Sequence, residues 1–473
     1  MIHPAASPVR AFLDDHSDRF LDELAAWVRI PSVSAVAEHE ADLVRSARWL
    51  AACLSESGFP RVEELDAGGP PAVFAHWPCE DPGAPTVLVY SHHDVRAVKD
   101  EEWEETSPFE PVRRLGHVYG RGTSDAKGQL LCHVWALRAH LAVTGRRCPA
   151  VDLKLLVEGE EEIGSPHLAD LLKQHAELLA ADVVILTDTM TWSVQEAAVC
   201  TAVRGMVSAH LEVRGPLRDV HSGLVSGAAP NPLTELCRLI GRLHDEHGRI
   251  TLPGFYDTVT RPTDEQRARL AEIPFDPDDW IRRTQTRAIC GEEGYSVLER
   301  VWMRPSVEVD ALIGGDPEGT SRGVIPAVAS ADLIFHTVPG QRVEQVEQQL
   351  RQWVTDHIGD HVDYELTFSP TNSEPYATPP DHPALAVLEQ ALARTVNRPA
   401  HRMRNGGNAP AELLSQTLDA PVLFFGTGLP EDHWHDSDEK ADVQALLNGA
   451  ETLAHLLADL PRAMEDDGGD PPG

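Results

Sequence analysis

Apolar segments that alternate with helical patterns restrict the fold of the first 200 residues of this 473-residue chain more than any other feature. The segments "PTVLVYSHHD", "VDLKLLVEGEEE" and "ADVVILTDT" are apolar over most of their length. Helical patterns lie between them, at about residues 128–140 and within "PHLADLLKQHAELL". Strands that are apolar on both faces are typical of a parallel sheet. We therefore predict an α/β domain with a mostly parallel sheet and helices on both faces.

The hydrophobic pattern changes after about residue 204. The segments "GMVSAHLEVRG" and "AVASADLIFHTVPG" alternate apolar and polar residues, as antiparallel strands with one solvated face do. The later segment "APVLFFGTG" is again an apolar strand. Because the chain is too long for one ordinary core, we predict an α/β domain in two parts, 1–203 and 372–473, with an α+β domain inserted at 204–371. The tail "EDDGGDPPG" is predicted to be disordered.

The balance of charge excludes several classes of partner. The chain has 75 acidic residues against 40 lysines and arginines, a formal charge of −35, which repels nucleic acid and anionic lipid surfaces. No apolar run approaches the roughly 18–20 residues that span a membrane, and "MIHPAASPVR" does not have the pattern of a secretory signal. The seven cysteines are scattered and form no CxxC pair. We predict a cytoplasmic protein that has no disulfide framework and binds neither nucleic acid nor membranes.

Histidines and carboxylates follow several of the predicted strands. They occur in "YSHHDVRA", "VEGEEEIGS", "ILTDT" and "GTGLPEDHWHDSDEK", and "YGRGTSDAKG" adds an acid before a helix. Taken alone, an acidic cluster is usually a solvated turn, and His92 is more often an ordinary histidine than a ligand. Because the carboxyl ends of parallel strands meet at one edge of a sheet, however, these groups are expected to converge. Imidazoles and carboxylates without thiolates indicate two zinc or manganese ions, whose charge offsets the repulsion among the carboxylates.

A series of short motifs extends over nearly the whole chain. In order, they read "HHDV", "WEETSPFEP", "YGRGTSDAKG", "EGEEEIGS", "VHSG", "VIPA", "TVPGQ", "GGNAP" and "HWHDSDEK". In these motifs the chain resembles the co-catalytic zinc metallopeptidases, which include carnosinase-like dipeptidases, aminoacylases and acetylornithine deacetylases. It is most similar to the dipeptidases. The resemblance implies that 1–203 and 372–473 form the catalytic domain, and that 204–371 is a lid and dimerisation domain.

The resemblance also implies five metal ligands and two supporting acids. The five ligands are His92, Asp125, Glu162, Asp188 and His435. Asp125 would bridge two divalent ions, with His92 and Asp188 completing one site and Glu162 and His435 the other. Asp94 would orient the imidazole of His92, and Glu161 would act as the general base toward a water between the metals. The expected ions are zinc, with manganese or cobalt as alternatives, and a cis peptide bond is expected at Asp125–Ala126.

His221, within "RDVHSG", belongs to the inserted domain. From its surroundings in the sequence alone, it is equally well a histidine of a surface loop. The resemblance implies that it reaches across a homodimer to donate a hydrogen bond to the oxyanion of the reaction. Closure of the inserted domain would then assemble the site and exclude water.

Five residues are expected to contact the substrate: His336, Arg404, Asn405, Gly407 and Asn408. The dipeptidases usually have an arginine at the position of His336, and a histidine cannot form the bidentate contact that a guanidinium forms with a carboxylate. Arg404 or Arg322 is the expected substitute. In "RNGGNAP", Asn405 and Asn408 replace an acid and a serine of the family motif, so a free substrate ammonium would meet no carboxylate there.

These motifs predict a two-metal hydrolase that cleaves the peptide bond of dipeptides or similarly small peptides. A second interpretation is deacylation of N-acylated amino acids, because an acylated nitrogen carries no charge and needs no acid at Asn405. A more remote alternative is a non-catalytic protein that binds a small ligand or regulates a partner. The presence of Glu161 and of all five ligands argues against that alternative.

Overall fold

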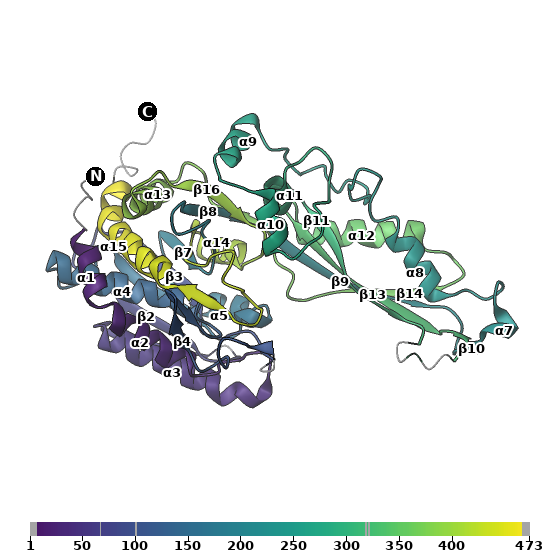
Figure 1. The fold of residues 1–473 in the computed structure, drawn as a ribbon, viewed down its shortest axis with the longest axis horizontal. Helices are drawn as coiled ribbons and strands as arrows, with labels where there is room; N and C mark the ends of the chain where they lie inside the picture. Colours follow the sequence, from purple (N-terminus) through teal and green to yellow (C-terminus); the bar gives the residue numbers. More distant parts are fainter. Residues whose placement is uncertain (1–6, 67, 100–101, 317–318, 320–321, 466–473) are drawn as a thin grey trace.

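The structure is a computed structural model that describes residues 7–66, 68–99, 102–316, 319 and 322–465. Two bodies lie side by side along the long axis of the molecule, one around a six-stranded sheet and one around a four-stranded sheet (Figure 1). Residues 466–473, which form nearly all of the tail predicted to be disordered, lie outside the described residues.

The six-stranded sheet has the order β1-β2-β6-β3-β7-β17. Its strands are β1 (Arg61–Leu65), β2 (Ala72–Trp77), β3 (Thr86–His92), β6 (Asp152–Glu158), β7 (Val183–Thr187) and β17 (Val422–Phe425). Strands β6, β3, β7 and β17 are parallel to one another, whereas β1 and β2 add an antiparallel edge. The prediction of a mostly parallel sheet is confirmed.

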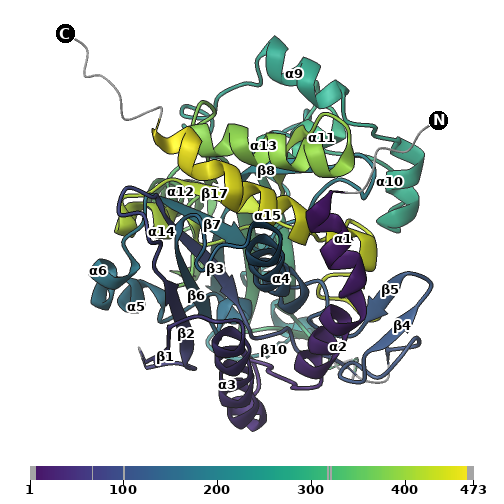
Figure 2. The same cartoon turned by 90° about the vertical axis from the view of Figure 1, so that its left-hand side faces the viewer.

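Helices cover both faces of this sheet, because its strands are apolar on both sides. In β3, Val87 and Val89 face one hydrophobic core, while Leu88 and Tyr90 face another. The first core is closed by α1 (Pro8–Asp15), α2 (Ser17–Val28), α3 (Glu40–Glu56), α4 (Lys127–Thr144), α13 (Pro383–Val396) and α15 (Val443–Glu465). The second is closed by α5 (Leu168–Gln174), α6 (Ala176–Leu179), α11 (Val297–Met303) and α14 (Ala411–Leu418). Figure 2 shows α3, α4 and α15 on one side of the sheet and α5, α6 and α14 on the other.

The second body is an antiparallel sheet of order β11-β13-β9-β14. Its strands are β9 (Gly205–Arg214), β11 (Ser306–Gly314), β13 (Val328–Thr337) and β14 (Asp363–Phe368). Alternate residues of β9 are buried, and α8 (Pro232–Ile240) and α12 (Val343–His357) cover that face. The predicted α+β character of this region is therefore confirmed. A two-stranded ribbon of β10 (Val220–His221) and β12 (Val324–Ile325) lies next to α7 (Ser222–Val225) at the end of the body (Figure 1).

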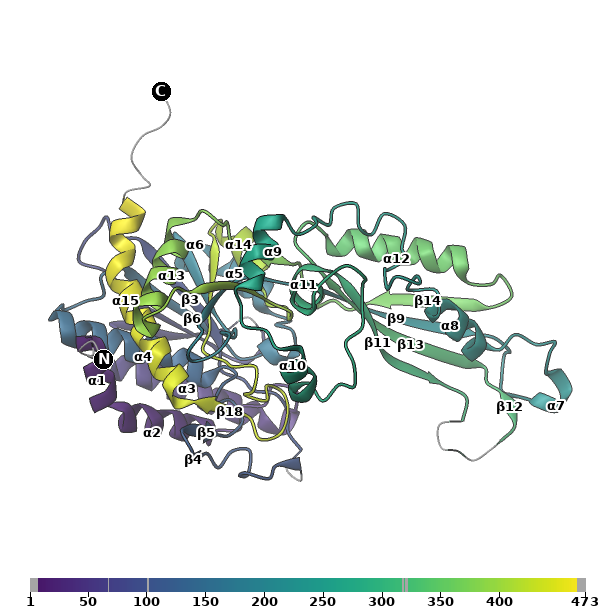
Figure 3. The same cartoon turned by 45° about the horizontal axis from the view of Figure 1, so that its top comes forward.

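Further elements connect or flank the two bodies. They are η1 (Ala37–His39), β4 (Val112–Arg114), β5 (His117–Tyr119), η3 (Glu161–Ile163), β8 (Ala198–Val203), α9 (Asp264–Ala271), α10 (Pro277–Arg283), β15 (Tyr376–Ala377), β16 (His401–Asn405) and β18 (Lys440–Asp442). Figure 3 shows α9, α10 and α11 between the two sheets. Ile273, Leu298 and Trp302, from this segment, pack into the second core of the six-stranded body. The domain boundaries at residues 204 and 372 stay a prediction.

All seven cysteines are free thiols, as predicted. Among the described residues, no helix combines the length and the apolar character that are needed to cross a membrane. The cytoplasmic location stays a prediction.

Candidate metal centre

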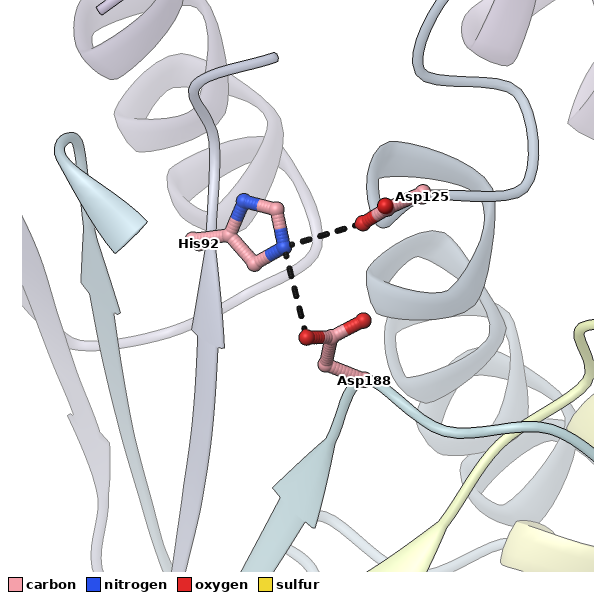
Figure 4. Close-up of side chains that lie close together, drawn as sticks. All are labelled: His92, Asp125 and Asp188. Atoms are coloured by element: carbon pink, nitrogen blue, oxygen red, sulfur yellow. Dashed lines mark ion pairs between the residues drawn. The ribbon is translucent and has the colours of Figure 1, made fainter. Parts of the chain in front are cut away.

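The predicted ligands lie at one edge of the six-stranded sheet. His92 is the last residue of β3, Asp188 directly follows β7, and the glutamate turn η3 follows β6. Asp125 belongs to the loop that leads into α4 from across this edge (Figure 4). The three strands are parallel neighbours, so their carboxyl ends and the polar residues that follow them converge.

His92, Asp125 and Asp188 form a first group of possible ligands. The Nε2 atom of His92 lies 3.3 Å from Oδ1 of Asp125 and 3.8 Å from Oδ2 of Asp188 (Figure 4). One ligand atom from each residue lies within 4.8 Å of the others. Three donors at this spacing, from an imidazole and two carboxylates, can bind one divalent cation.

Asp125, Glu162 and His435 form a second group. The Nε2 atom of His435 lies 3.0 Å from Oδ2 of Asp125 and 3.3 Å from Oε2 of Glu162. Asp125 thus turns one carboxylate oxygen toward His92 and the other toward His435. This arrangement suits a carboxylate that bridges two cations. The Asp125–Ala126 peptide bond is cis, as expected.

The electrostatics of both groups favour bound cations. Burial, together with the charge of Asp125, raises the pKa of Glu162 and of Asp188 above the ordinary values. Burial alone would lower the pKa of His92, but the neighbouring carboxylates, Asp125 first among them, raise it well above its usual value. Three buried atoms, His92 Nε2, Glu162 Oε1 and Asp188 Oδ1, have no hydrogen-bond partner in the described structure. Buried polar atoms are rarely left unsatisfied, so these atoms are suited to coordinating metal.

Asp94 contacts residues of both ligand groups and stabilises their positions. Its Oδ1 lies 3.3 Å from Nδ1 of His92, and its carboxylate accepts hydrogen bonds from the backbone N–H groups of Glu161 and Glu162, at 3.2 and 3.1 Å. The side chain is completely buried. A single carboxylate therefore fixes the ring of one predicted ligand and the turn that carries another.

Two of the four glutamates in "VEGEEEIGS" serve the local structure. Glu158 accepts hydrogen bonds from the hydroxyl groups of Tyr90 and Ser165, and Glu160 accepts them from the backbone and the ring of His167. Both glutamates are buried, with exposed fractions of 3% and 5%. These structural roles of Glu158 and Glu160 could not be predicted from the sequence, because four similar side chains occur in five positions.

Glu161 is the glutamate that remains. Its side chain makes no hydrogen bond or ion pair with the part of the chain that the structure describes, whereas Glu162 faces His435. Burial raises the pKa of Glu161 well above its usual value; His92 opposes this shift, and Asp188 adds to it. A carboxylate with a raised pKa and no partner is suited to accepting a proton.

Glu439 is a supporting residue that the sequence analysis did not identify. It is completely buried and accepts hydrogen bonds from the backbone N–H groups of Gly122, Ser124 and Asp125, at 2.9–3.1 Å. Its Oε2 also lies 2.7 Å from Nη1 of Arg121. Glu439 thus holds the loop that presents Asp125. Its place in "HWHDSDEK" was the only signal, and an acid in a polar motif usually faces solvent.

Two predicted substrate residues, His336 and Asn405, lie near the junction of the two bodies. His336, on β13, pairs with Met206 on β9, two residues after Arg204. Burial, with a smaller contribution from the Arg204 cation, lowers the pKa of His336 to about 4, so the ring is neutral at pH 7. Arg204 Nε donates to the carbonyl of Gly406, at 2.7 Å, and therefore supports the predicted substrate loop.

That loop follows β16. Asn405 accepts a hydrogen bond from the backbone N–H of Gly407, at 2.9 Å, and the Gly407 carbonyl accepts one from the backbone of Arg204. Gly407 and Asn408 are exposed. Arg404, the residue before Asn405, instead lines a cavity next to α9. None of the predicted metal ligands belongs to the wall of this cavity.

The other distant candidates lie at the far end of the four-stranded body. His221 ends β10 and is exposed, and β10 lies at the opposite end of the molecule from the six-stranded sheet (Figure 1). Arg322, near the paired strand β12, donates to the carboxylate of Asp219. Within one chain the structure therefore does not bring His221 or Arg322 to the two ligand groups.

Curated proteins resemble this chain along its length. Cys-Gly metallodipeptidase dug1 of Schizosaccharomyces pombe is 28% identical over 464 residues, which cover 94% of this chain and 97% of that protein. Beta-Ala-His dipeptidase of Homo sapiens is 26% identical over 477 residues, covering 95% of this chain and 91% of that protein. Both similarities extend over both bodies of the structure.

Solved structures share the fold. Human carnosine dipeptidase 1 superposes with a TM-score of 0.83 at 24% identity, covering 97% of this chain and all of that chain. The M20 family metallo-carboxypeptidase Sso-CP2 from Sulfolobus solfataricus gives a TM-score of 0.83 at 24% identity, covering 94% of this chain and 100% of that chain. The sequence profile of peptidase family M20/M25/M40 matches residues 88–459, which include all five predicted ligands. The resemblance in the motifs is thereby confirmed, and the chain belongs to peptidase family M20/M25/M40 and is a metal-dependent peptidase.

Proposed function

We propose that the chain is a two-metal hydrolase that cleaves the peptide bond of dipeptides or similarly small peptides. The observation that carries this proposal is the pair of ligand groups that share Asp125, with Glu161 beside them and without a partner in the described structure. Two curated relatives over nearly the full length are named as dipeptidases, which supports a small peptide as substrate.

The donor set fits two divalent cations. His92 and Asp188 would hold one ion, Glu162 and His435 the other, and Asp125 both. Imidazole and carboxylate donors without thiolate suit zinc, and manganese or cobalt are alternatives. When bound, the two cations supply Lewis-acid polarisation of the scissile carbonyl and lower the pKa of water to about 7.

The protein's own groups would then move the proton and hold the geometry. Glu161 would accept a proton from the attacking water and deliver it to the leaving amine. The raised pKa of Glu161 favours this role, because it makes the carboxylate a stronger proton acceptor. Asp94, through His92 and the backbone of the glutamate turn, would keep the ligands in place.

We further propose that the chain forms a homodimer through the four-stranded body. Strand β11 is at the edge of this sheet and exposes Val309, Leu312 and Ile313, with exposed fractions of 41%, 44% and 56%. An exposed apolar edge strand is suited to pairing with a second copy. Such a dimer would allow His221, which lies far from the ligands of its own chain, to approach those of its partner.

Glu161→Gln tests the proposed reaction. Purified wild type is expected to contain two metal ions per chain and to release free amino acids from dipeptides. The variant should keep both ions and lose about 10²–10⁴-fold in turnover, the usual contribution of a general base. A variant that keeps full turnover would show that Glu161 is not the base. A metal-loaded wild type that cleaves no dipeptide would refute the proposed substrate.

Deacylation of N-acylated amino acids is a second candidate, and one feature favours it. Asn405 is neutral and already accepts a hydrogen bond from Gly407. It therefore cannot neutralise the free ammonium of a dipeptide. Pairs of substrates that differ only in a free or acetylated amino end decide between the two reactions, because a dipeptidase prefers the free amine and a deacylase the acetylated one.

A further inference from the structure

A cavity of about 200 Å³ lies between α9, α11, α13 and strand β16. Three arginines line it, Arg269, Arg402 and Arg404, and no aspartate or glutamate does. This is unusual in a chain with 75 acidic residues against 40 basic ones. None of the residues of the two metal-ligand groups belongs to its wall.

Two of the three arginines are already neutralised. Arg402 contacts the carboxylate of Glu389 with both Nε and Nη2, and Arg269 Nη2 lies 2.7 Å from Oε1 of Glu265. These two ion pairs leave little free charge for a ligand.

Arg404 differs from both. Its half-buried guanidinium makes no hydrogen bond or ion pair with any residue that the structure describes. Burial lowers its pKa; the Cys200 thiol opposes that shift, and no carboxylate does. A guanidinium removed from water without a counter-ion is costly, and a bound anion would offset this cost.

The remaining wall of the cavity is largely apolar. Leu270, Met303 and Leu385 contribute to it from three different helices. The volume is several times that of one water, whose share of the liquid is about 30 Å³, so a small inorganic anion would leave much of the cavity empty. The guanidinium fork is complementary to a carboxylate, which it can bind with two parallel hydrogen bonds.

We infer that this cavity is a second ligand site, separate from the metal centre, that binds a small organic carboxylate with an aliphatic body. The carboxylate pairs with Arg404, and the aliphatic body packs on Leu270, Met303 and Leu385. This site goes beyond the proposed hydrolysis and does not depend on it. Because Arg404 directly precedes Asn405, a ligand there would also contact the strand that leads into the predicted substrate loop.

Calorimetric titration of the metal-loaded protein with hexanoate tests this site. We expect wild type to bind one hexanoate per chain, and to bind neither hexan-1-ol, which has no charge, nor phosphate with comparable affinity. Arg404→Met should weaken hexanoate at least tenfold. Arg398→Met is the matched control, because Arg398 is exposed, pairs with Glu196 and does not line the cavity; it should bind like wild type.

Leu270→Trp provides an independent variant, since it enlarges a side chain of the cavity wall on α9 and leaves Arg404 unchanged. This variant should also abolish hexanoate binding, and it tests the proposed site even if Arg404→Met does not fold. The proposal is overturned if wild type binds no hexanoate. It is equally overturned if Leu270→Trp, or a folded Arg404→Met, binds as tightly as wild type, since the carboxylate would then bind elsewhere, such as at the metals.

Discussion

Replacing Glu439 by glutamine tests the support of the bridging carboxylate without changing any predicted ligand. The Glu439 side chain is fully buried and accepts three backbone N–H groups, from Gly122, Ser124 and Asp125, in addition to the guanidinium of Arg121. Glutamine has nearly the same shape but carries no charge. Its NH₂ group would have to face at least one of these donors, and Arg121 would lose its counter-ion.

The size of the effect follows from these contacts. Removing one partner of a buried ion pair costs about 3–5 kcal/mol, because the other charge stays buried without compensation. Residues that orient metal ligands from behind typically contribute about 10–100-fold to metal affinity. We therefore expect Glu439→Gln to lower the free energy of unfolding by about 3–5 kcal/mol and to weaken metal binding by about 10–100-fold.

Urea unfolding of the metal-free proteins measures the first effect, and metal titration measures the second. Glu412→Gln is the matched control: Glu412 lies 3.0 Å from Arg342, whose side chain is 58% exposed, and a surface pair of this kind contributes less than about 1 kcal/mol. If Glu439→Gln loses no more stability than this control and binds metal like wild type, Glu439 does not hold the Asp125 loop.

Three further predictions concern the charge beside the metals, the pH dependence of stability and the proposed dimer. Arg96 Nε lies 3.4 Å from Oε2 of Glu162, and the positive charge of Arg96 repels a cation bound there. In a metal titration, Arg96→Gln should therefore bind the second metal about fivefold more tightly than wild type, and unchanged or weaker binding would contradict this. Burial lowers the pKa of His133 to about 3, so the native state stays unprotonated when the unfolded state, with a pKa near 6.5, gains a proton. Stability is therefore lost as the pH falls below about 6.5, by about 2 kcal/mol at pH 5, and urea unfolding at pH 7.5 and 5 should show that His133→Gln removes this part of the dependence. His221→Ala should lower turnover without changing the metal content. Mixed dimers of this variant with the inactive Glu161→Gln chain, whose own His221 is intact, should recover turnover; if they do not, His221 does not contribute across the dimer.

The convergence of the metal ligands could be predicted from the sequence because it depends on few assumptions. Strands β3 and β7 are apolar over most of their length, which predicts that they are central and parallel and that the polar residues at their ends meet at one edge. The position of His92 and Asp188 at this edge follows from the rule, whereas their roles as ligands were implied by the resemblance to the metallopeptidases. The assignment of the four glutamates depends instead on neighbours such as Tyr90 and His167, which no local pattern places.

Other features depend on contacts between distant segments. Glu439 looks like a surface acid in its motif, and only the packing of its loop against residues 121–125 buries it. Arg404 was expected at the substrate, but β16 places it on the α9 side of the strand, in a separate cavity. The packing of Trp302 into the six-stranded body could not be predicted from the sequence either, because a helical pattern does not show which body the helix packs against.

The central claim is that two cations share Asp125, and anomalous X-ray scattering at the zinc absorption edge tests it most directly. We predict two anomalous peaks about 3.5–4 Å apart, one beside His92 and Asp188 and one beside Glu162 and His435, with Asp125 between them. A single peak in crystals soaked with excess zinc, or two peaks of which only one contacts Asp125, would contradict the two-metal account.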